Sequence, residues 1–583
     1  MTLIISVLLG FIAVCGFRYE VTDDYLKLTN TYSFFWLMLF CFFVWALYRA
    51  MHEKDRPLLL CSALFALIIS TFSSFGVSIA KMHRLSWIWE SKGYLVNFLN
   101  LYYGRFILYF CFGYTVYGLL KGREPKDRTA VKQKFSFGRV LLWWGILLLF
   151  FIPWYLLLYP GILTPDSGAQ VRDAITVNPL IDHHSAFLDL VLRGILLPVR
   201  HWTGSLQTAV GITMLLQMLI VTFAFAWCYE WIRRYLSCRA LRLFAFLWFA
   251  VYPLHPIYSV TMWKDILFSI SFLFLMLCLD SAAADEDAFF TSVMKKLALF
   301  LTLLLLPLMR HNGLSITVVM TVYLFFRFRR YRRQAAVICG CALAAFGIWK
   351  FVLLPAMNVT GITPAHVYSV QEQQIVRILD ERRDELTEDE LAELESYFDI
   401  PEIWNVYNPI LSDPVKVHFR NSRFNEDPGK FFSLWLDLGK RYPLTYLESV
   451  LMNNFGYWYP ELNYWYSDFG VVQVAEIEDI HSAPILRIGV VESVFNWFRS
   501  YGFLKIPMGN LLFSPAACFW VWIFCGIYCL YRNRKKFILF IPGFALWLGI
   551  LVTPINNDFR YVYGLFTALP LLLAAGLTKQ REE

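Results

Sequence analysis

Runs of about 20 apolar residues recur from one end of this chain to the other. Each run is long enough to cross the roughly 30 Å hydrocarbon core of a bilayer as an α-helix. Of the 583 residues, 58% are hydrophobic and only 16% are charged. The runs are continuously apolar, whereas the strands of a membrane β-barrel alternate apolar and polar residues. The sequence therefore predicts an all-α polytopic protein of the cell membrane.

We predict fourteen spans, whose linkers divide the chain into four parts. The spans lie at 2–16, 31–49, 57–80, 97–119, 139–159, 205–231, 241–260, 264–281, 295–309, 313–328, 335–355, 511–531, 536–553 and 559–577. The four parts are an N-terminal transmembrane module (1–120), a transmembrane core (139–355) with a first outer loop at 160–204, an extracytoplasmic domain (357–510) and C-terminal transmembrane helices (511–583).

The positions of Lys and Arg orient these spans. The linker 121–139 is the most basic short connection, and such linkers are usually cytoplasmic. Alternation then places most other basic linkers on the same side, puts both termini in the cytoplasm and puts the first outer loop outside. Two linkers, 81–94 and 280–290, do not fit this pattern. The net charge of +8 comes from clusters beside spans, so it does not indicate nucleic-acid binding.

The stretch from Tyr159 to Phe187 turns polar directly after a span, which is typical of a functional site in a membrane protein. Ser167 and Gln170 match a capping pattern, so we expect Ser167 to cap a helix running to about Val177. Asp166 would then precede the positive end of that helix, which favours its ionised form. Such a carboxylate can act as a general base; alternatively, Asp166 is itself the N-cap.

The same loop contains Asp182, His183 and His184. Together with Asp166, residues of these types can bind a divalent cation such as Mg²⁺ or Mn²⁺, with Asp166, Asp182 and His184 as the candidate ligands. They can also contact a phosphate or a sugar directly. A third interpretation is that the two histidines only begin the next helix, which lies in the membrane interface.

Several further polar residues fall at outer ends of predicted spans, where the positive-inside trend disfavours Lys and Arg. They are Lys264, Asp265, Arg310, His311, Asn312 and Arg560. Arg310 occupies the tip of a short hairpin, and an arginine buried at that depth needs an anionic partner. A bound phosphate would account for these cations. The alternatives are snorkelling anchors and internal ion pairs.

The predicted extracytoplasmic domain reads as mostly helical. Thr387 and Glu390 match a capping box ahead of an apolar pattern. The domain also carries two aromatic triplets, which either stack on sugar rings or form an interfacial belt. They are Tyr457, Trp458, Tyr459, Tyr464, Trp465 and Tyr466.

Taken together, these motifs resemble polytopic glycosyltransferases of the GT-C superfamily, in particular a poorly characterised bacterial family. The resemblance covers residues from about 139 to the C-terminus. It is carried by Tyr159-Pro160-Gly161, Asp166-Ser167, Gln170, Asp182-His183-His184, Lys264-Asp265, Arg310, Asn312-Gly313, Gln373-Gln374-Ile375, Arg377, Asp413-Pro414-Val415-Lys416, Tyr457-Trp458-Tyr459-Pro460 and Arg560-Tyr561. The sequence departs from that family's pattern at Gln371-Glu372 and at the His183-His184 doublet.

The resemblance implies an inverting transfer of a sugar from a polyprenyl-phosphate-linked donor to a glycan, lipid or protein acceptor on the extracytoplasmic face of the membrane. It implies that residues 139–355 are the catalytic core, with Asp166 as the base or a metal-bound carboxylate. It adds Gln374 and Arg377 to the substrate-binding candidates. Two rival functions remain open: a polymerase- or ligase-type transferase acting on an undecaprenyl-diphosphate glycan through Arg310 and His311, and a lipid or glycan transporter without chemistry.

Overall fold

The computed structural model of the chain describes residues 1–17, 19–22, 25–28, 33–122, 135–176, 180–182, 184–234, 236, 239–460, 480–506, 508–552 and 558–576. His183 and the second aromatic triplet (464–466) lie outside the described residues. Within them, nine helices are long and apolar enough to cross a membrane. The only paired strands in this part of the chain are β1 (Tyr19–Thr22) and β2 (Tyr25–Leu28), which run antiparallel. The prediction of a helical polytopic membrane protein is confirmed.

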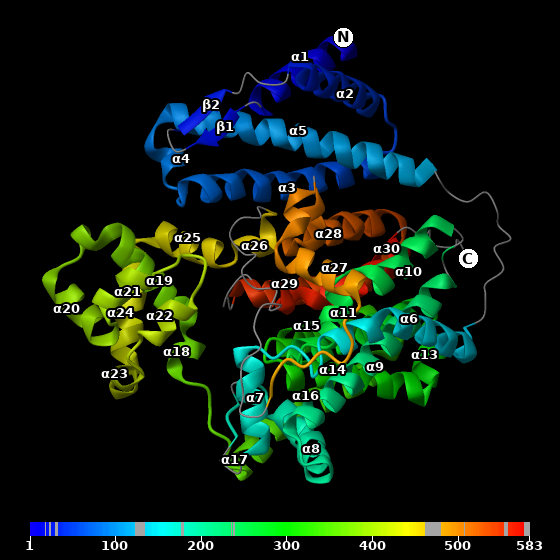
Figure 1. The fold of residues 1–583 in the computed structure, drawn as a ribbon. Coiled ribbons are helices and arrows are strands. Elements are labelled where there is room, and N and C mark those ends of the chain that lie inside the picture. The colour runs from blue at the N-terminus through cyan, green and yellow to red at the C-terminus, as the bar shows by residue number, and fades with distance from the viewer. Residues whose placement is uncertain are drawn as a thin grey trace.

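The first 122 residues form a layer of long helices along one side of the molecule (Figure 1). This layer consists of α1 (Thr2–Phe17), α2 (Ser33–Met51), α3 (Arg56–Met82), α4 (Trp87–Glu90) and α5 (Lys92–Gly122). α1, α2 and α5 share a small core around Phe43, Ala46 and Ile107. On the inner side of the layer, the Tyr117 hydroxyl donates to the carbonyl of Phe524, 2.9 Å away. The module is thereby attached to the C-terminal helices.

Residues 137–356 build the central body. Its elements are α6 (Phe137–Leu157), α7 (Pro165–Ile175), α8 (Ala186–Thr203), α9 (Leu206–Arg233), α10 (Arg239–Val251), α11 (Leu254–Ser259), α12 (Lys264–Ala284), α13 (Glu286–Thr291), α14 (Val293–Met309), α15 (Gly313–Arg327), the 3-10 turn η1 (Arg329–Tyr331), α16 (Arg332–Ile348), the π-helical turn η2 (Trp349–Leu353) and α17 (Leu354–Ala356). The range predicted as one span at 241–260 is not one continuous helix: the chain breaks between α10 and α11 at Pro253, which cannot supply a helical N–H.

The remaining helices form a separate outer lobe and the C-terminal bundle. The lobe contains α18 (Pro364–Val367), α19 (Ser369–Arg382), η3 (Arg383–Glu385), α20 (Glu388–Tyr397), α21 (Ile400–Val406), α22 (Asp413–Val417), α23 (Asn421–Glu426), α24 (Pro428–Arg441) and α25 (Pro443–Asn453). After it come α26 (Phe455–Trp458), α27 (Gly489–Arg499), η5 (Gly502–Lys505), η6 (Gly509–Phe513), α28 (Pro515–Arg532), η7 (Arg534–Leu539), α29 (Ile541–Val552), η8 (Phe559–Val562) and α30 (Tyr563–Gly576).

The outer lobe has a hydrophobic core of its own, drawn from residues between Ala365 and Tyr446. The capping box predicted at Thr387 and Glu390 is confirmed at the start of α20. In contrast, Tyr457 of α26 and Phe498 of α27 belong to the core of the membrane-spanning body. The segment 357–510 therefore contributes both a lobe and part of the main body.

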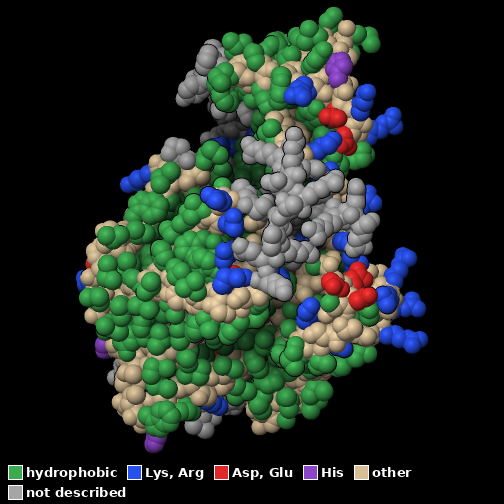
Figure 2. Space-filling view, turned by 90° about the vertical axis from the view of Figure 1, so that its right-hand side faces the viewer, with side chains coloured by type: hydrophobic (Ala, Val, Ile, Leu, Met, Phe, Trp, Pro, Cys, Tyr) green, Lys and Arg blue, Asp and Glu red, His purple; other side chains and the backbone are tan. Residues whose placement is uncertain are grey.

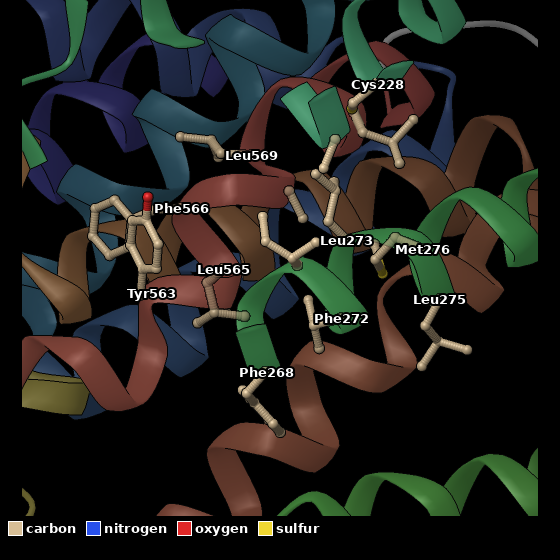
Figure 3. Close-up of a cluster of buried hydrophobic side chains, with 14 of the residues drawn as sticks. Cys228, Phe268, Phe272, Leu273, Leu275, Met276, Tyr563, Leu565, Phe566 and Leu569 are labelled. Atoms are coloured by element: carbon tan, nitrogen blue, oxygen red, sulfur yellow. The ribbon is translucent and has the colours of Figure 1, made fainter. Parts of the chain in front are cut away.

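The centre of the body lies where α9, α12 and α30 meet. Phe268, Phe272 and Leu273 of α12 lie next to Tyr563, Leu565 and Phe566 of α30 (Figure 3). These side chains face protein rather than lipid, so α12 and α30 are among the most deeply buried helices. The exterior is apolar as well: Leu149, Phe326 and Phe351 are largely exposed. Broad hydrophobic areas, with Lys and Arg gathered in patches, cover the surface in Figure 2. Such an exterior suits a lipid environment.

Candidate active site

Asp166 lies in the first turn of α7, and that helix begins with a closed capping box. Thr164 Oγ1 accepts the N–H of Ser167 at 3.4 Å, and Ser167 Oγ accepts the N–H of Thr164 at 3.1 Å. The prediction that Ser167 is the cap and that Asp166 precedes the helix is wrong, because the Thr164 hydroxyl three residues earlier takes that role. Asp166 is not the N-cap either. Its carboxylate is therefore not used in capping.

The loop that leads into α7 is fixed against the start of α12. Trp263 Nε1 donates to Thr164 Oγ1 at 2.8 Å, and Ser167 Oγ donates to the Met262 carbonyl at 2.6 Å. Gly161 has φ of +137°, and a Cβ there would lie 2.9 Å from the carbonyl oxygen of Val260. Only glycine accommodates that approach. These contacts give Asp166 one defined position.

Arg560, in η8 at the start of the last helix, binds Asp166 directly. Arg560 NH1 lies 2.6 Å from Asp166 Oδ2, and Arg560 Nε lies 2.5 Å from Asp558 Oδ2. The guanidinium also lies 4.8 Å from the centre of the Trp263 ring. The Arg560 side chain is 12% exposed and that of Asp166 is 38% exposed. Asp558 and Trp263 thus hold the Arg560 guanidinium in place, while the Asp166 carboxylate stays partly exposed.

The charges around Asp166 keep it ionised. Burial by itself raises the pKa of the carboxyl, but Arg560, His184 and Lys264 lower it, and the net pKa lies below the usual 3.8. His184 is half-buried on the loop after α7, and Lys264 is the half-buried first residue of α12. The structure therefore brings together four of the predicted site residues: Asp166, His184, Lys264 and Arg560.

A second Arg–Asp pair lies deeper. Arg310 NH1 is 2.9 Å from Asp265 Oδ1, and the two side chains are 5% and 1% exposed. The Arg310 guanidinium also stacks on Tyr561, 4.3 Å from the ring centre. The prediction that a buried Arg310 needs an anionic partner is confirmed. Of the roles considered for Arg310, the structure matches the internal ion pair.

Asp182 forms a third cluster, in the middle of the loop 160–204. Its carboxylate pairs with Lys350 and accepts the N–H of Ala186 at 3.3 Å. Its carbonyl accepts the Nε2–H of His311 at 3.0 Å. Burial lowers the pKa of His311, so its ring is neutral at neutral pH. Asn312 follows it at the half-buried start of α15.

Lys350 was not identified from the sequence. It lies in the π-helical turn η2 at the end of an apolar span, and π-helical turns occur frequently at functional sites. Its position at the predicted outer end of that span was the available signal, since the same argument selects Lys264 and Arg560. Half-exposed and beside Asp182, it adds a further cation to Arg560, Lys264 and Arg310.

Asp189 of α8 was also missed. Its side chain is fully buried, and neither carboxylate oxygen has a hydrogen-bond partner within normal distance among the described residues. Burial and the nearby charge of Asp173 raise its pKa to about 7, although Lys264 and the Gln170 amide oppose this. From the sequence, Asp189 reads as an ordinary polar residue of an amphipathic helix.

The described residues do not provide a metal site. They contain no group of three His, Cys, Asp or Glu side chains placed to hold an ion. Asp166 and Asp182, two of the three candidate ligands, are instead engaged by Arg560 and Lys350. Among the residues that the structure describes, the donor set therefore does not fit the divalent cation considered from the sequence.

Other predicted residues lie in the outer lobe or in packed interfaces. Gln374 bonds with Trp435 and Tyr446, and Arg377 pairs with Glu381 and Asp380. None of these bonds reaches the Asp166 cluster. Tyr457 and Trp458 are buried, so neither the sugar-stacking nor the interfacial-belt interpretation applies to them.

The arrangement combines an accessible carboxylate with cations at one end of an apolar body. An incoming anion can compete with Asp166 for Arg560, and the released carboxylate can then accept a proton. Fixed cations in a partly buried site also stabilise negative charge that develops on a leaving group. Both properties suit a group transfer from a phosphate-linked donor.

A comparison with known families gives a match over most of the chain. The model of a family described as "Family of unknown function (DUF6020)" matches residues 175–583. No curated protein and no solved structure matches the chain. The match begins at the end of α7, so it includes Arg560, Lys350 and Asp182 but leaves out Asp166 and the N-terminal module.

Proposed function

The chain belongs to the family of unknown function DUF6020, and we propose that it is a membrane glycosyltransferase that uses a polyprenyl-phosphate-linked sugar as donor. One observation carries this proposal: the 2.6 Å pair between a 38% exposed Asp166 and a mostly buried Arg560, at one end of a body of membrane-spanning helices. A lipid-linked donor would bind its phosphate at this pair and leave its chain among the helices.

In the proposed reaction, the donor phosphate takes the place of Asp166 on Arg560. Arginine binds phosphate oxygens in a planar, two-pronged geometry, and Asp558 and Trp263 already hold this guanidinium in place. Once Arg560 is shared with a phosphate, its charge lowers the pKa of Asp166 less. The carboxylate then becomes a stronger base at the moment when substrate is present.

The chemical step is a displacement at the anomeric carbon of the sugar. The oxygen of an acceptor hydroxyl forms a bond to that carbon, while the bond from the carbon to the phosphate oxygen breaks with inversion. The hydroxyl proton passes to Asp166. The polyprenyl phosphate leaves with the bonding electron pair, and Arg560 and Lys264 stabilise its charge. No metal ion takes part in this scheme.

The finer architecture belongs to the same proposal. We propose fourteen spans in a GT-C-like arrangement, with both termini in the cytoplasm and Asp166 on the extracytoplasmic side. A helix lies within each of the fourteen predicted ranges, five of them shorter or broken. The basic linkers carry most of the argument for orientation.

The rival transferase that works through Arg310 and His311 loses support from the geometry. Arg310 is enclosed by Asp265 and Tyr561, and His311 bonds to the backbone of Asp182. Neither side chain can reach a substrate without breaking these contacts. The rival hypothesis of a lipid or glycan transporter is decided by the liposome experiment that follows.

The test uses the purified full-length protein in liposomes with a polyprenyl-phosphate sugar radiolabelled in the sugar. We expect label to pass from the lipid to an added acceptor, with release of free polyprenyl phosphate. Asp166→Asn should remove this activity, whereas Asp173→Asn, on the same helix, should retain it. Full activity of Asp166→Asn would overturn the assignment of the base. Label that crosses the bilayer still attached to its lipid would indicate a transporter.

A further inference from the structure

The N-terminal module packs against the C-terminal helices along an apolar crevice. One cavity of about 220 Å³ lies between α3, α28 and α29, and a second of about 260 Å³ lies between α3, α25 and α29. In Figure 1, α3 lies beside α28. The module's helix α3 thus supplies one wall of both cavities, and α3 lies outside the residues that match the family.

The two cavities meet at one pair of aromatic rings. Phe72 of α3 and Trp547 of α29 line both of them, and their ring centres are 5.9 Å apart. From this pair, the first cavity runs along α28 between Phe519 and Leu530, a length of about 16 Å at the rise of an α-helix. The second continues to Leu451 of α25.

The lining of this crevice excludes polar ligands. Every lining side chain is apolar except that of Thr71. The Thr71 hydroxyl donates to the carbonyl of Leu67 within its own helix, 2.7 Å away. A water molecule or a sugar would find almost no hydrogen-bond partner there, and apolar cavities accept apolar occupants. The occupant must therefore be hydrocarbon.

The middle of the crevice, where the two cavities meet at Trp547, is joined to the Asp166 site by a chain of hydrogen bonds. Trp547 Nε1 donates to the carbonyl of Tyr457 at 3.1 Å, and the Tyr457 hydroxyl donates to the carbonyl of Asp558 at 2.8 Å. Asp558 in turn binds Arg560. The crevice and the Arg560 guanidinium therefore border the same bonded group of residues, Trp547, Tyr457 and Asp558. A lipid phosphate with its head at Arg560 and its chain in the crevice would pass around this group.

We propose that the crevice between α3 and helices α28–α29 holds the isoprenoid chain of the lipid phosphate, and that the N-terminal module serves to enclose it. This inference rests on the proposed function for the phosphate at Arg560. It assigns a role to a module that carries no polar motif of its own. An ordinary bilayer phospholipid in the crevice is the competing outcome.

The test uses the full-length protein in nanodiscs and a polyprenyl phosphate without sugar, which carries a photoactivatable group in its chain. After irradiation, mass spectrometry locates the labelled residues. We expect labels on α3, α28 and α29, with competition by unlabelled polyprenyl phosphate but not by phospholipid. Labels on other helices, or equal competition by phospholipid, would overturn the proposal.

Paired variants on α3 sharpen the test. Ile68→Trp fills the first cavity, whereas Leu67→Trp adds the same ring at a neighbouring position that is 51% exposed. We expect Ile68→Trp to reduce labelling about tenfold, which corresponds to about 1.4 kcal/mol, and Leu67→Trp to leave it unchanged. Equal labelling of the two folded variants would contradict the proposal. If Ile68→Trp does not fold, the label positions in the unaltered protein still decide.

The failure of this inference can be told apart from the failure of the proposed function, because the probe carries no sugar. If the probe labels the crevice but no sugar is transferred, this inference holds and the proposed function is wrong. If sugar is transferred but the probe labels other helices, the proposed function holds and this inference is wrong.

Discussion

Two Arg–Asp pairs at one end of this molecule have similar geometry and different surroundings. In one, Arg310 and Asp265 lie 2.9 Å apart and both are almost completely buried. In the other, Arg560 and Asp166 lie 2.6 Å apart, and the carboxylate is partly open. A buried pair is costly to break and cannot be reached by substrate. The difference in exposure thus separates a structural pair from one that can exchange partners.

The largest effect should follow from breaking the buried pair. Arg310→Ala leaves Asp265 charged and without a partner inside the body, which typically costs about 3–5 kcal/mol. We expect a strong fall in the thermal unfolding temperature of the detergent-solubilised protein. Arg330→Ala, which removes one half of a largely exposed pair with Asp287, is the control and should change little. A small loss in Arg310→Ala would show that the two Arg–Asp pairs do not differ as proposed.

A substitution in the partly exposed Arg560–Asp166 pair should weaken substrate binding more than it lowers the stability of the protein. Arg560→Gln removes the charge that holds the donor phosphate, and a charge-assisted hydrogen bond contributes about 1.5–3 kcal/mol. We expect binding of a polyprenyl-phosphate sugar, measured by titration calorimetry or by competition, to weaken by about ten- to a hundredfold. The unfolding temperature should fall less than in Arg310→Ala. Unchanged binding in a folded Arg560→Gln protein would remove Arg560 from the phosphate site.

The same substitution should move the pH dependence of the transfer. Arg560 helps to lower the pKa of Asp166, while burial raises it. Without the arginine charge the pKa of Asp166 rises, so the carboxylate becomes protonated at a higher pH. The acidic limb of kcat/KM, which reports the free enzyme, should therefore shift to higher pH in Arg560→Gln. If the limb stays in place, Asp166 is not the group whose ionisation controls the rate.

The smallest effect is expected for Lys350. Its side chain, which pairs with Asp182, is about one-third exposed. Because solvent screens such pairs, we expect Lys350→Ala to cost about 1 kcal/mol or less. The loss should be local, since Asp182 also receives the Ala186 N–H. Hydrogen exchange near residues 180–186 should become faster, with exchange in α12 unchanged. A global loss of protection would indicate that this pair supports the whole body.

Local patterns in the sequence predicted much of the helical framework. Continuous apolar runs gave helices in all fourteen expected ranges, because hydrocarbon requires every backbone polar group to be bonded within its own segment. The break at Pro253 was missed because the apolar residues continue across it. The cap of α7 was assigned to Ser167 because two hydroxyls, at Thr164 and Ser167, compete for one role within four residues.

Candidate site residues could be predicted from the sequence only where a charged residue stood at an unusual place, such as a span end or a hairpin tip. The need for an anion beside Arg310 followed from its place at a hairpin tip, and that need is met by Asp265. Lys350 carries a comparable signal that was overlooked. Asp189 carries none, because an amphipathic helix normally turns such a residue toward water. The metal hypothesis could not be decided from residue types, since Asp182 and Asp166 find cationic partners from distant segments.

By itself, the sequence determined that this chain is a helical membrane protein with a polar loop after a span and cations at the ends of spans. Those properties depend on local hydropathy and charge, which act over one helix length. Tertiary structure alone decided that Asp166 meets Arg560, since 394 residues separate them. It also decided that Arg310 is enclosed and that α3 closes an apolar crevice against α28 and α29. Such pairings depend on which helices pack together, and no local pattern specifies that.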